Sequence, residues 1–304
     1  MAIAASTGNG NTAWMSKLPE PISNLPLYYL AIPGSHNSFS ADLDRTQDVS
    51  IDEPGAIKFL GKIGGKGIIY NWGKCQTLSI KEQLEAGIRY LDLRICRNPK
   101  SKQLTFLHGL YGRPVKELIA NVQSFLEVYS KEVILIDVNH LYGCSADDVL
   151  RVFVSKMDEK LLSKDRLADS SQPPSLSNIW NSKYGTPRVI LFLHNHACGF
   201  DNLRIYSPWH NTDKHETLFQ KLDSQKNNNN CFNVSQGVLT PQTKTILTNH
   251  SLKTFVDNTG INSRFMEWLK KKKSGHESGI NICICDFIEC NSYIDTVIGM
   301  NTES

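Results

Sequence analysis

The chain has 304 residues, of which 40% are hydrophobic and 21% charged, and its formal net charge is +3 at pH 7. This balance argues against extensive disorder, and so small a charge argues against a dedicated nucleic-acid-binding protein. No apolar run is long enough to span a bilayer, and the N-terminus lacks the charged and apolar regions of a secretory signal. We therefore expect a cytoplasmic protein without a transmembrane segment, whose eight cysteines are reduced thiols.

Strand and helix patterns alternate along nearly the whole chain. The first half predicts, in order, strand Leu27–Ile32, helix Ser79–Ala86, strands Gly87–Cys96 and Leu104–Gly109, helix Val115–Tyr129 and strand Glu132–Val138. The second half predicts helix Ala146–Leu162, strands Arg188–Leu193 and Asn233–Leu239, helix Asn262–Lys273, strand Asn281–Ile288 and a short helix to about Asn301. Ser79 and Glu82 have the spacing of a capping box.

No Pro/Ser-rich linker divides this alternation, and no repeat of fixed period is present. We therefore predict an α/β fold with a single parallel sheet. The number of candidate strands favours a closed TIM-type (β/α) barrel, regular or distorted, over an open sheet. The barrel is assigned to residues 14–304, and residues 1–13 are predicted to form a flexible N-terminus.

Two segments are predicted to be loops. Gln225–Asn230 has the composition of a surface loop. Gly61–Lys74 is rich in glycine but lacks the spacing of a phosphate-binding P-loop. Its Ile68, Ile69, Tyr70 and Trp72 either touch lipid or pack across the mouth of the barrel.

Polar side chains gather where the predicted strands end. His36 and Asn37 follow the first strand, Asp92 and Arg94 share one side of the second, and His108 ends the third. Asn139, His194 and Asp286 lie at the ends of later strands. Active sites of barrels lie at the carboxyl ends of their strands, so this set is a candidate catalytic centre.

The set suits cleavage of a phosphodiester. One imidazole can take a proton from the attacking hydroxyl and a second can protonate the leaving oxygen. A guanidinium can hold the charged nonbridging oxygens. His36 with Asp286 behind it, His108 opposite and Arg94 between them would meet this requirement.

The motifs IPGSHNS, EQLEAGIRYLDLR, FLHG, EVILIDVNH and ICDFI resemble the X region of phosphatidylinositol-specific phospholipases C. The chain is most similar to the small eukaryotic family of phosphatidylinositol-specific phospholipase C X-domain-containing proteins. The likeness begins near Trp14 and runs almost to the C-terminus, and the family fold is a TIM barrel.

The resemblance implies a role for each motif residue. His36 is the general base, His108 the general acid, Arg94 the phosphate ligand with Asp92 beside it, and Asp286 the partner of the base. Asn37, Asn139 and His194 fall at substrate-binding positions. Asn139 and His194 depart from the basic residues of bacterial relatives, which leaves headgroup recognition open.

The resemblance also raises the question whether the protein needs a metal ion. Calcium-dependent relatives carry an asparagine, which is a metal ligand, at the position of Asn37. Calcium needs six to eight oxygen ligands, and Arg94 occupies the position of a further carboxylate. We therefore predict an enzyme that needs no metal and no cofactor.

Three other signals have alternative interpretations. His194, His196 and Cys198, or Cys283, Cys285 and Cys290, could hold zinc, although neither group has paired C-x-x-C spacing. Lys270–Lys273 either ends a solvated helix or approaches anionic lipid. Trp72 and Trp209 are candidate membrane-rim or lid residues.

The main hypothesis is a peripheral phosphodiesterase that cleaves phosphatidylinositol-type lipids at a membrane surface, with no protein partner indicated. A catalytically weak lipid-binding or scaffold protein that retains the barrel is the alternative. A glycerophosphodiesterase fits less well, because its carboxylate-rich metal set is missing.

Overall fold

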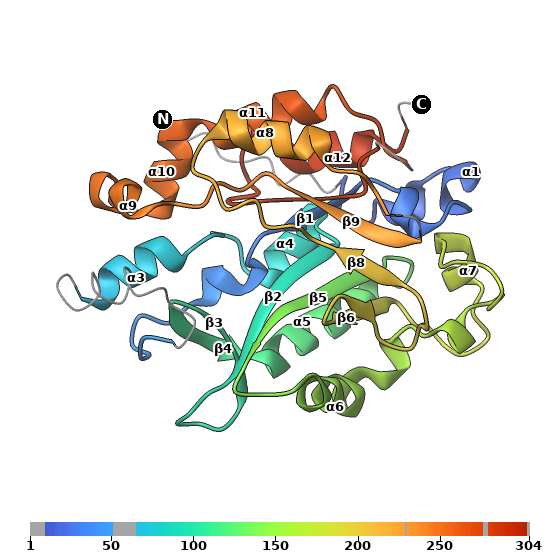
Figure 1. The fold of residues 1–304 in the computed structure, drawn as a ribbon. Helices are drawn as coiled ribbons and strands as arrows, with labels where there is room; N and C mark the ends of the chain where they lie inside the picture. Colours follow the sequence, from blue (N-terminus) through green and yellow to red (C-terminus); the bar gives the residue numbers. More distant parts are fainter. Residues whose placement is uncertain (1–9, 51–64, 229, 276–278, 303–304) are drawn as a thin grey trace.

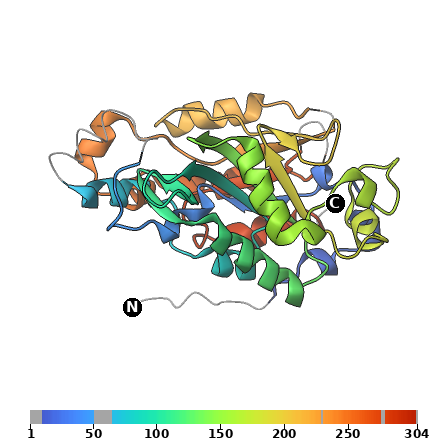
Figure 2. The ribbon, with the colours of Figure 1, turned by 90° about the horizontal axis from the view of Figure 1, so that it is seen from below.

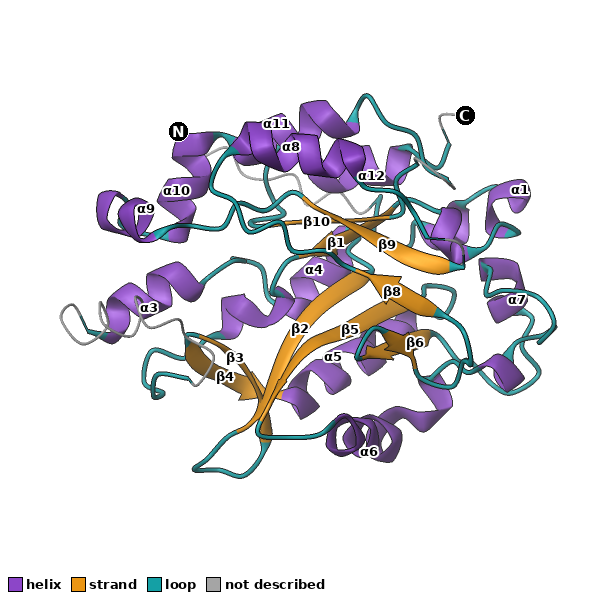
Figure 3. Ribbon diagram, in the orientation of Figure 1, coloured by secondary structure: helices purple, strands orange, loops and turns teal. Residues whose placement is uncertain are grey.

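The computed structural model describes residues 10–50, 65–228, 230–275 and 279–302. Eight strands close into a barrel in the order β1, β10, β9, β8, β7, β6, β5 and β2, and β1 pairs with β2 to complete the ring (Figures 1 and 3). The strands are β1 Ile32–Ser35, β2 Tyr90–Arg97, β5 Ile134–Tyr142, β6 Val189–Leu193, β7 His196–Ala197, β8 Arg204–Tyr206, β9 Cys231–Gln236 and β10 Ile282–Cys285. The predicted barrel is confirmed.

Helices surround the barrel (Figure 1). They are α1 Glu20–Ser23, α3 Lys66–Gly73, α4 Ile80–Ala86, α5 Val115–Val128, α6 Ala146–Met157, α7 Leu176–Trp180, α8 His215–Ser224, α9 Thr243–Thr248, α10 Leu252–Thr259, α11 Ile261–Leu269 and α12 Tyr293–Gly299. Helices α5 and α6 cover the side that faces the viewer in Figure 2, and α8, α10 and α11 lie on the opposite side. The capping box predicted at Ser79 and Glu82 opens α4.

The barrel is not purely parallel, which corrects the prediction of a parallel sheet. Strands β3 (Leu104–His108) and β4 (Leu110–Pro114) form an antiparallel hairpin on β2, and β7 runs antiparallel to β6 and β8. Short connections force this, because parallel neighbours need a crossover of a dozen or more residues. Between β6 and β7 only His194 and Asn195 intervene, both with positive φ (49° and 66°), as in a tight hairpin turn.

The predicted strand Leu27–Ile32 is wrong in its bounds. Leu27–Tyr29 form a turn of 3-10 helix after Pro26, whose carbonyl accepts a hydrogen bond from the Tyr29 N–H at 2.8 Å. The strand is Ile32–Ser35 instead, so His36 still follows its end. A side chain at Gly34 would lie 2.7 Å from the Tyr90 ring, so only glycine fits between β10 and β2.

Alternation along the strands sorts side chains into two layers. Inward residues fill the barrel, and they are Ile32, Tyr90, Leu135, Ile190, Phe192, Phe232, Val234, Ile282 and Ile284. Outward residues such as Leu91, Ile136 and Leu191 pack against the helices. At the carboxyl ends of the strands the inward positions become polar, and the candidate site begins there.

Two of the predicted segments lie partly outside the described residues. Of the predicted N-terminus 1–13, residues 1–9 lie outside the described residues, and Thr12 donates a hydrogen bond to the Glu85 carbonyl at 2.8 Å. Of the predicted loop Gly61–Lys74, residues 61–64 also lie outside them, and Lys66–Gly73 form helix α3 rather than a loop. Ile69 and Trp72 of α3 are buried, which matches the packed alternative.

Candidate functional site

The end of β1 presents His36 and Asn37 to the mouth of the barrel. Asn37 has a left-handed backbone (φ 42°), a conformation that asparagine tolerates better than most residues. This turn directs the Asn37 N–H to Asp92 Oδ2 at 2.8 Å, while the side-chain amide returns to His36 Nε2 at 3.0 Å. The two residues are therefore held by β2 as well as by β1.

The His36 ring is fixed by a carboxylate. Its Nδ1 lies 2.6 Å from Asp286 Oδ1, just beyond the end of β10, and the two side chains are 16% and 3% exposed. Burial alone would lower the pKa of His36, but the charge and hydrogen bond of Asp286 raise it well above its ordinary value. With the proton on Nδ1, the lone pair of Nε2 accepts the hydrogen bond from Asn37 Nδ2.

Two amide side chains support this pair. Gln76 is fully buried and donates from Nε2 to the carbonyls of His36 and Cys285, both at 2.9 Å. Asn262 of α11 donates to the Asp286 carbonyl at 2.8 Å. The backbones on either side of the His36–Asp286 contact are thus tied to the surrounding helices and loops.

Asp92 is bonded on both of its oxygens. Oδ2 accepts from the Asn37 N–H, and Oδ1 accepts from Asn139 Nδ2 at 2.7 Å. Asn139 lies at a bulge, where the pairing of β2 with β5 shifts between Leu93 and Arg94. The carboxylate of β2 therefore connects β1 and β5.

His108 ends β3 and lies on the other side of a buried thiol. Its Nδ1 is 2.8 Å from the Gly73 carbonyl and 3.8 Å from Cys75 Sγ. Cys75 Sγ in turn accepts from Asn37 Nδ2 at 3.4 Å. One ligand atom each of Cys75, His36 and Asp286 lie within 4.8 Å of one another, so both imidazoles flank a single sulfur atom.

Burial and the charge of Asp286 favour the neutral thiol, but His108 and His36 lower the pKa of Cys75 below its ordinary value.

Arg94 is half-buried on the inward side of β2, two residues beyond Asp92. Within the described residues no hydrogen bond or ion pair engages its guanidinium. It is thus a cation at the mouth that no carboxylate among the described residues neutralises.

The remaining predicted site residue, His194, is exposed in the tight turn between β6 and β7. It has no hydrogen-bond partner in the described part of the chain.

The two zinc groups considered from sequence do not converge. Within the described ranges, His36, Cys75 and Asp286 are the one group of three or more such residues close enough to share a metal. Cys283 and Cys285 are fully buried on the outward face of β10, and burial raises the pKa of both thiols.

The lysine run lies at the end of α11, where Lys272 pairs with Asp223 at 2.7 Å and Lys270 with Glu267 at 2.7 Å. These contacts agree with a solvated helix end. Trp209 is 65% exposed and donates to Thr240 Oγ1 at 2.8 Å, whereas Trp72 is 6% exposed. Only Trp209 is therefore open to solvent.

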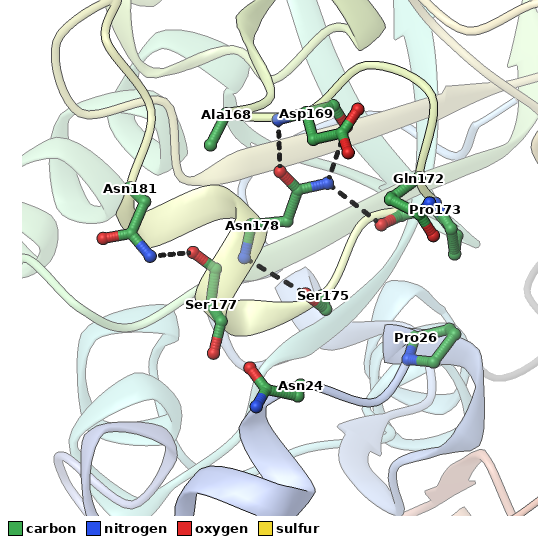
Figure 4. A pocket seen from close by; sticks show the side chains of 10 residues that line it. All are labelled: Asn24, Pro26, Ala168, Asp169, Gln172, Pro173, Ser175, Ser177, Asn178 and Asn181. Carbon is green, nitrogen blue, oxygen red and sulfur yellow. Dashed lines mark hydrogen bonds between the residues drawn. The ribbon is translucent and has the colours of Figure 1, made fainter.

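A cavity of about 360 Å³ lies beside α7, and Figure 4 shows the residues that line it. Its central Asn178 is satisfied by Asp169 and Pro173, and Ser175 caps the helix. Its lining holds no histidine, lysine or arginine, and its one carboxylate, Asp169, accepts hydrogen bonds from Ser171.

Sequence reasoning missed Cys75, Gln76 and Asn262. Cys75 and Gln76 follow α3 rather than a strand, and Asn262 lies inside a helix, so none carried the strand-end signal. A buried polar side chain within an otherwise apolar helical face was the one available sign at Asn262.

Three comparisons place the chain among known proteins. The family profile of the phosphatidylinositol-specific phospholipase C X domain matches residues 69–182, which include Asp92, Arg94 and His108. The mouse PI-PLC X domain-containing protein 2 is 33% identical, over 96% of this chain and 88% of its own length. The human PI-PLC X domain-containing protein 3 is also 33% identical, over 95% of this chain and 92% of its own.

Solved structures show the same fold at low identity. A phosphatidylinositol-specific phospholipase C from Staphylococcus aureus aligns with a TM-score of 0.66 at 16% identity, covering 97% of this chain and 99% of the other. The enzyme of that name from Listeria monocytogenes aligns with a TM-score of 0.62 at 19% identity, covering 95% and 98%. From the identity and coverage of its relatives, the chain belongs to the family of PI-PLC X domain-containing proteins.

Proposed function

We propose that this chain is a phosphodiesterase that cleaves phosphatidylinositol-type lipids between glycerol and phosphate. The observation that supports it most is the pair of imidazoles on either side of Cys75, of which His36 is oriented by Asp286. The X-domain match and the fold of the bacterial phospholipases agree with this assignment.

In the proposed reaction, His36 Nε2 takes the proton of the inositol 2-hydroxyl, whose oxygen attacks phosphorus. The bond from phosphorus to the glycerol oxygen breaks, and His108 supplies the proton to that oxygen. The Gly73 carbonyl favours a proton on His108 Nδ1, so the transferred proton comes from Nε2. The products are diacylglycerol and a cyclic inositol phosphate.

The phosphate is assigned to Arg94, whose guanidinium has no acidic partner within the described residues. A planar guanidinium binds two phosphate oxygens at once and stabilises the charge that develops on them. Asp92 acts as a positioning residue, because both of its oxygens are committed to Asn37 and Asn139.

The reaction is proposed to need no metal ion. Calcium would require several free oxygens, but the Asp92 carboxylate is already hydrogen-bonded on both oxygens and Arg94 follows two residues later. A second cation beside that guanidinium would be repelled.

Access to the substrate is proposed to occur at a membrane surface, since the substrate is a lipid. No helix in the described segments is long and apolar enough to cross a membrane.

The test is incubation with vesicles of phosphatidylinositol, with phosphatidylcholine vesicles as control, with and without chelator. We expect diacylglycerol and cyclic inositol phosphate from the first vesicles only, at a rate that chelator does not lower. Loss of turnover on chelation that calcium restores would contradict the metal-free proposal. Absence of any product with retained folding would contradict the enzyme.

A lipid-binding protein with little turnover is the second candidate. Two observations favour it: Asn139 is occupied by Asp92, and His194 is an exposed turn residue rather than a fixed cation. Vesicle binding without product would support this candidate.

A further inference from the structure

The mouth of the barrel holds a thiol, an imidazole and a carboxylate that converge. Cys75, His36 and Asp286 come from three separate segments, after α3, β1 and β10, and their ligand atoms lie within 4.8 Å of one another. The thiol is fully buried and the carboxylate is 3% exposed. We propose that Cys75 and His36 bind a zinc ion, and that the bound ion blocks the action of His36 as a base.

The donor set fits zinc. Zinc in proteins is bound by cysteine sulfur and histidine nitrogen, and thiolate is the softer ligand that selects it over calcium or magnesium. Because His36 Nδ1 faces Asp286, the nitrogen left for a metal is Nε2. The carboxylate then stands behind the metal-binding imidazole, an arrangement that orients the ring and raises its basicity.

The position between the two ligand atoms is occupied by one amide. Asn37 Nδ2 lies 3.0 Å from His36 Nε2 and 3.4 Å from Cys75 Sγ. Asn37 is fully buried, and its Oδ1 is a buried oxygen with no hydrogen-bond partner in the described residues. Such an oxygen is costly unless a ligand or water serves it.

Rotation of the Asn37 amide by half a turn would exchange its oxygen and nitrogen with little change of shape. The oxygen would then face both the sulfur and the imidazole, where a cation gains a third protein ligand. The same rotation removes the amide donor that now occupies His36 Nε2. Water completes the four ligands that zinc usually takes.

Binding releases the thiol proton of Cys75 to solvent, because the thiolate is the metal ligand. The lone pair of His36 Nε2 is then bound to zinc and cannot accept a proton. Zinc and turnover of the lipid are therefore mutually exclusive at this site. The inhibition rests on the proposed function, but the binding of zinc does not.

The experiment measures zinc binding by titration calorimetry on the full chain, together with the absorption of cobalt bound in place of zinc. We expect one ion per chain and a cobalt–thiolate charge-transfer band. Cys75→Ser should lower the zinc affinity by at least about 100-fold, and Asp286→Asn by about 10- to 100-fold. Cys198→Ser is the matched control, a half-buried thiol of the rejected zinc group, and should leave the affinity unchanged.

Absence of a thiolate band in the wild-type protein, or equal affinity in wild type and Cys75→Ser, would overturn the proposal. Should Cys75→Ser fail to fold, Cys75→Ala replaces it, and the wild-type cobalt spectrum decides without any variant. A chain that binds zinc through Cys75 but cleaves no lipid keeps the site and contradicts the proposed function. A chain that cleaves lipid but binds no zinc contradicts the zinc site and keeps the proposed function.

Discussion

The two sides of the barrel mouth differ in how firmly they hold their polar residues. On the side of β1 and β10, both ring nitrogens of His36 are engaged, and Asn37 and Gln76 are fully buried. On the side of β6 and β7, His194 is an exposed turn residue with no partner in the described part of the chain. The fold thus fixes the orientation of the His36 imidazole but not that of His194.

The largest expected effect is on the two imidazoles that flank Cys75. His36→Ala and His108→Ala should each lower kcat by about 10²- to 10⁴-fold, because each removes one proton-transfer group. The measurement is release of inositol phosphate from phosphatidylinositol vesicles. His215→Ala, which removes an imidazole paired with Glu216 on the surface, is the control and should retain full activity. An active double variant of His36 and His108 would show that neither imidazole is needed for turnover.

The next effect concerns the cation on β2. Arg94→Lys should lower kcat/KM by about 10²- to 10³-fold, because an ammonium cannot reproduce the two parallel hydrogen bonds of guanidinium to phosphate. Arg97→Lys on the same strand is the matched control, since Arg97 pairs with Asp148 at the surface. Equal rates in the two variants would show that Arg94 does not contact the phosphate.

A third prediction concerns the barrel interior below the mouth. Asp137 is fully buried, Tyr90 donates to its Oδ2 at 2.7 Å, and burial raises its pKa to about 7. Between its unfolded pKa near 3.8 and about 7, the folded chain keeps a proton that the unfolded chain has lost. This contribution to stability is therefore complete below about pH 4 and disappears as the pH rises through 7.

Asp137→Asn should remove that pH dependence and stabilise the protein at pH 8 by on the order of 2 kcal/mol relative to wild type. Urea unfolding at pH 5 and pH 8 measures it, with the exposed Asp147→Asn as control. If the wild type and Asp137→Asn lose equal stability between these pH values, another group causes the loss.

The smallest effect is expected on the open side. His194→Ala should change kcat/KM by less than about tenfold, or 1.4 kcal/mol, because the fold does not hold that imidazole in place. The assay uses phosphatidylinositol vesicles, and exposed His196→Ala, across the same turn, serves for comparison. A hundredfold loss at His194 alone would show that the substrate orders this turn and that both sides of the mouth act on the substrate.

Much of the fold could be predicted from the sequence. The apolar run Glu132–Val138 indicated a strand buried on both faces, and β5 is buried from Ile134 to Val138. Helix α5 ends one residue before its predicted end at Tyr129. These elements could be found because burial on one or both faces imposes a period of hydrophobicity along the chain.

The reversals of chain direction could not be predicted in the same way. The apolar pattern of β3 is the same whether it runs parallel or antiparallel to β2, and only the short connection decides. The turn at His194 depends on two consecutive residues with positive φ, for which the sequence carries no glycine. The first strand was predicted too early in the chain, because the apolar residues Leu27–Tyr29 suit a buried 3-10 turn as well as a strand.

The sequence by itself determined that seven polar residues lie in strands or directly after them, because residue type and strand periodicity are local properties. They are His36, Asp92, Arg94, His108, Asn139, His194 and Asp286. Only the tertiary structure decided which of them meet. It brought Asp286 to within 2.6 Å of His36 across 250 residues of sequence, placed Cys75 between the two imidazoles and left His194 in solvent. Such distances follow from barrel closure and strand register, which depend on all the strands at once.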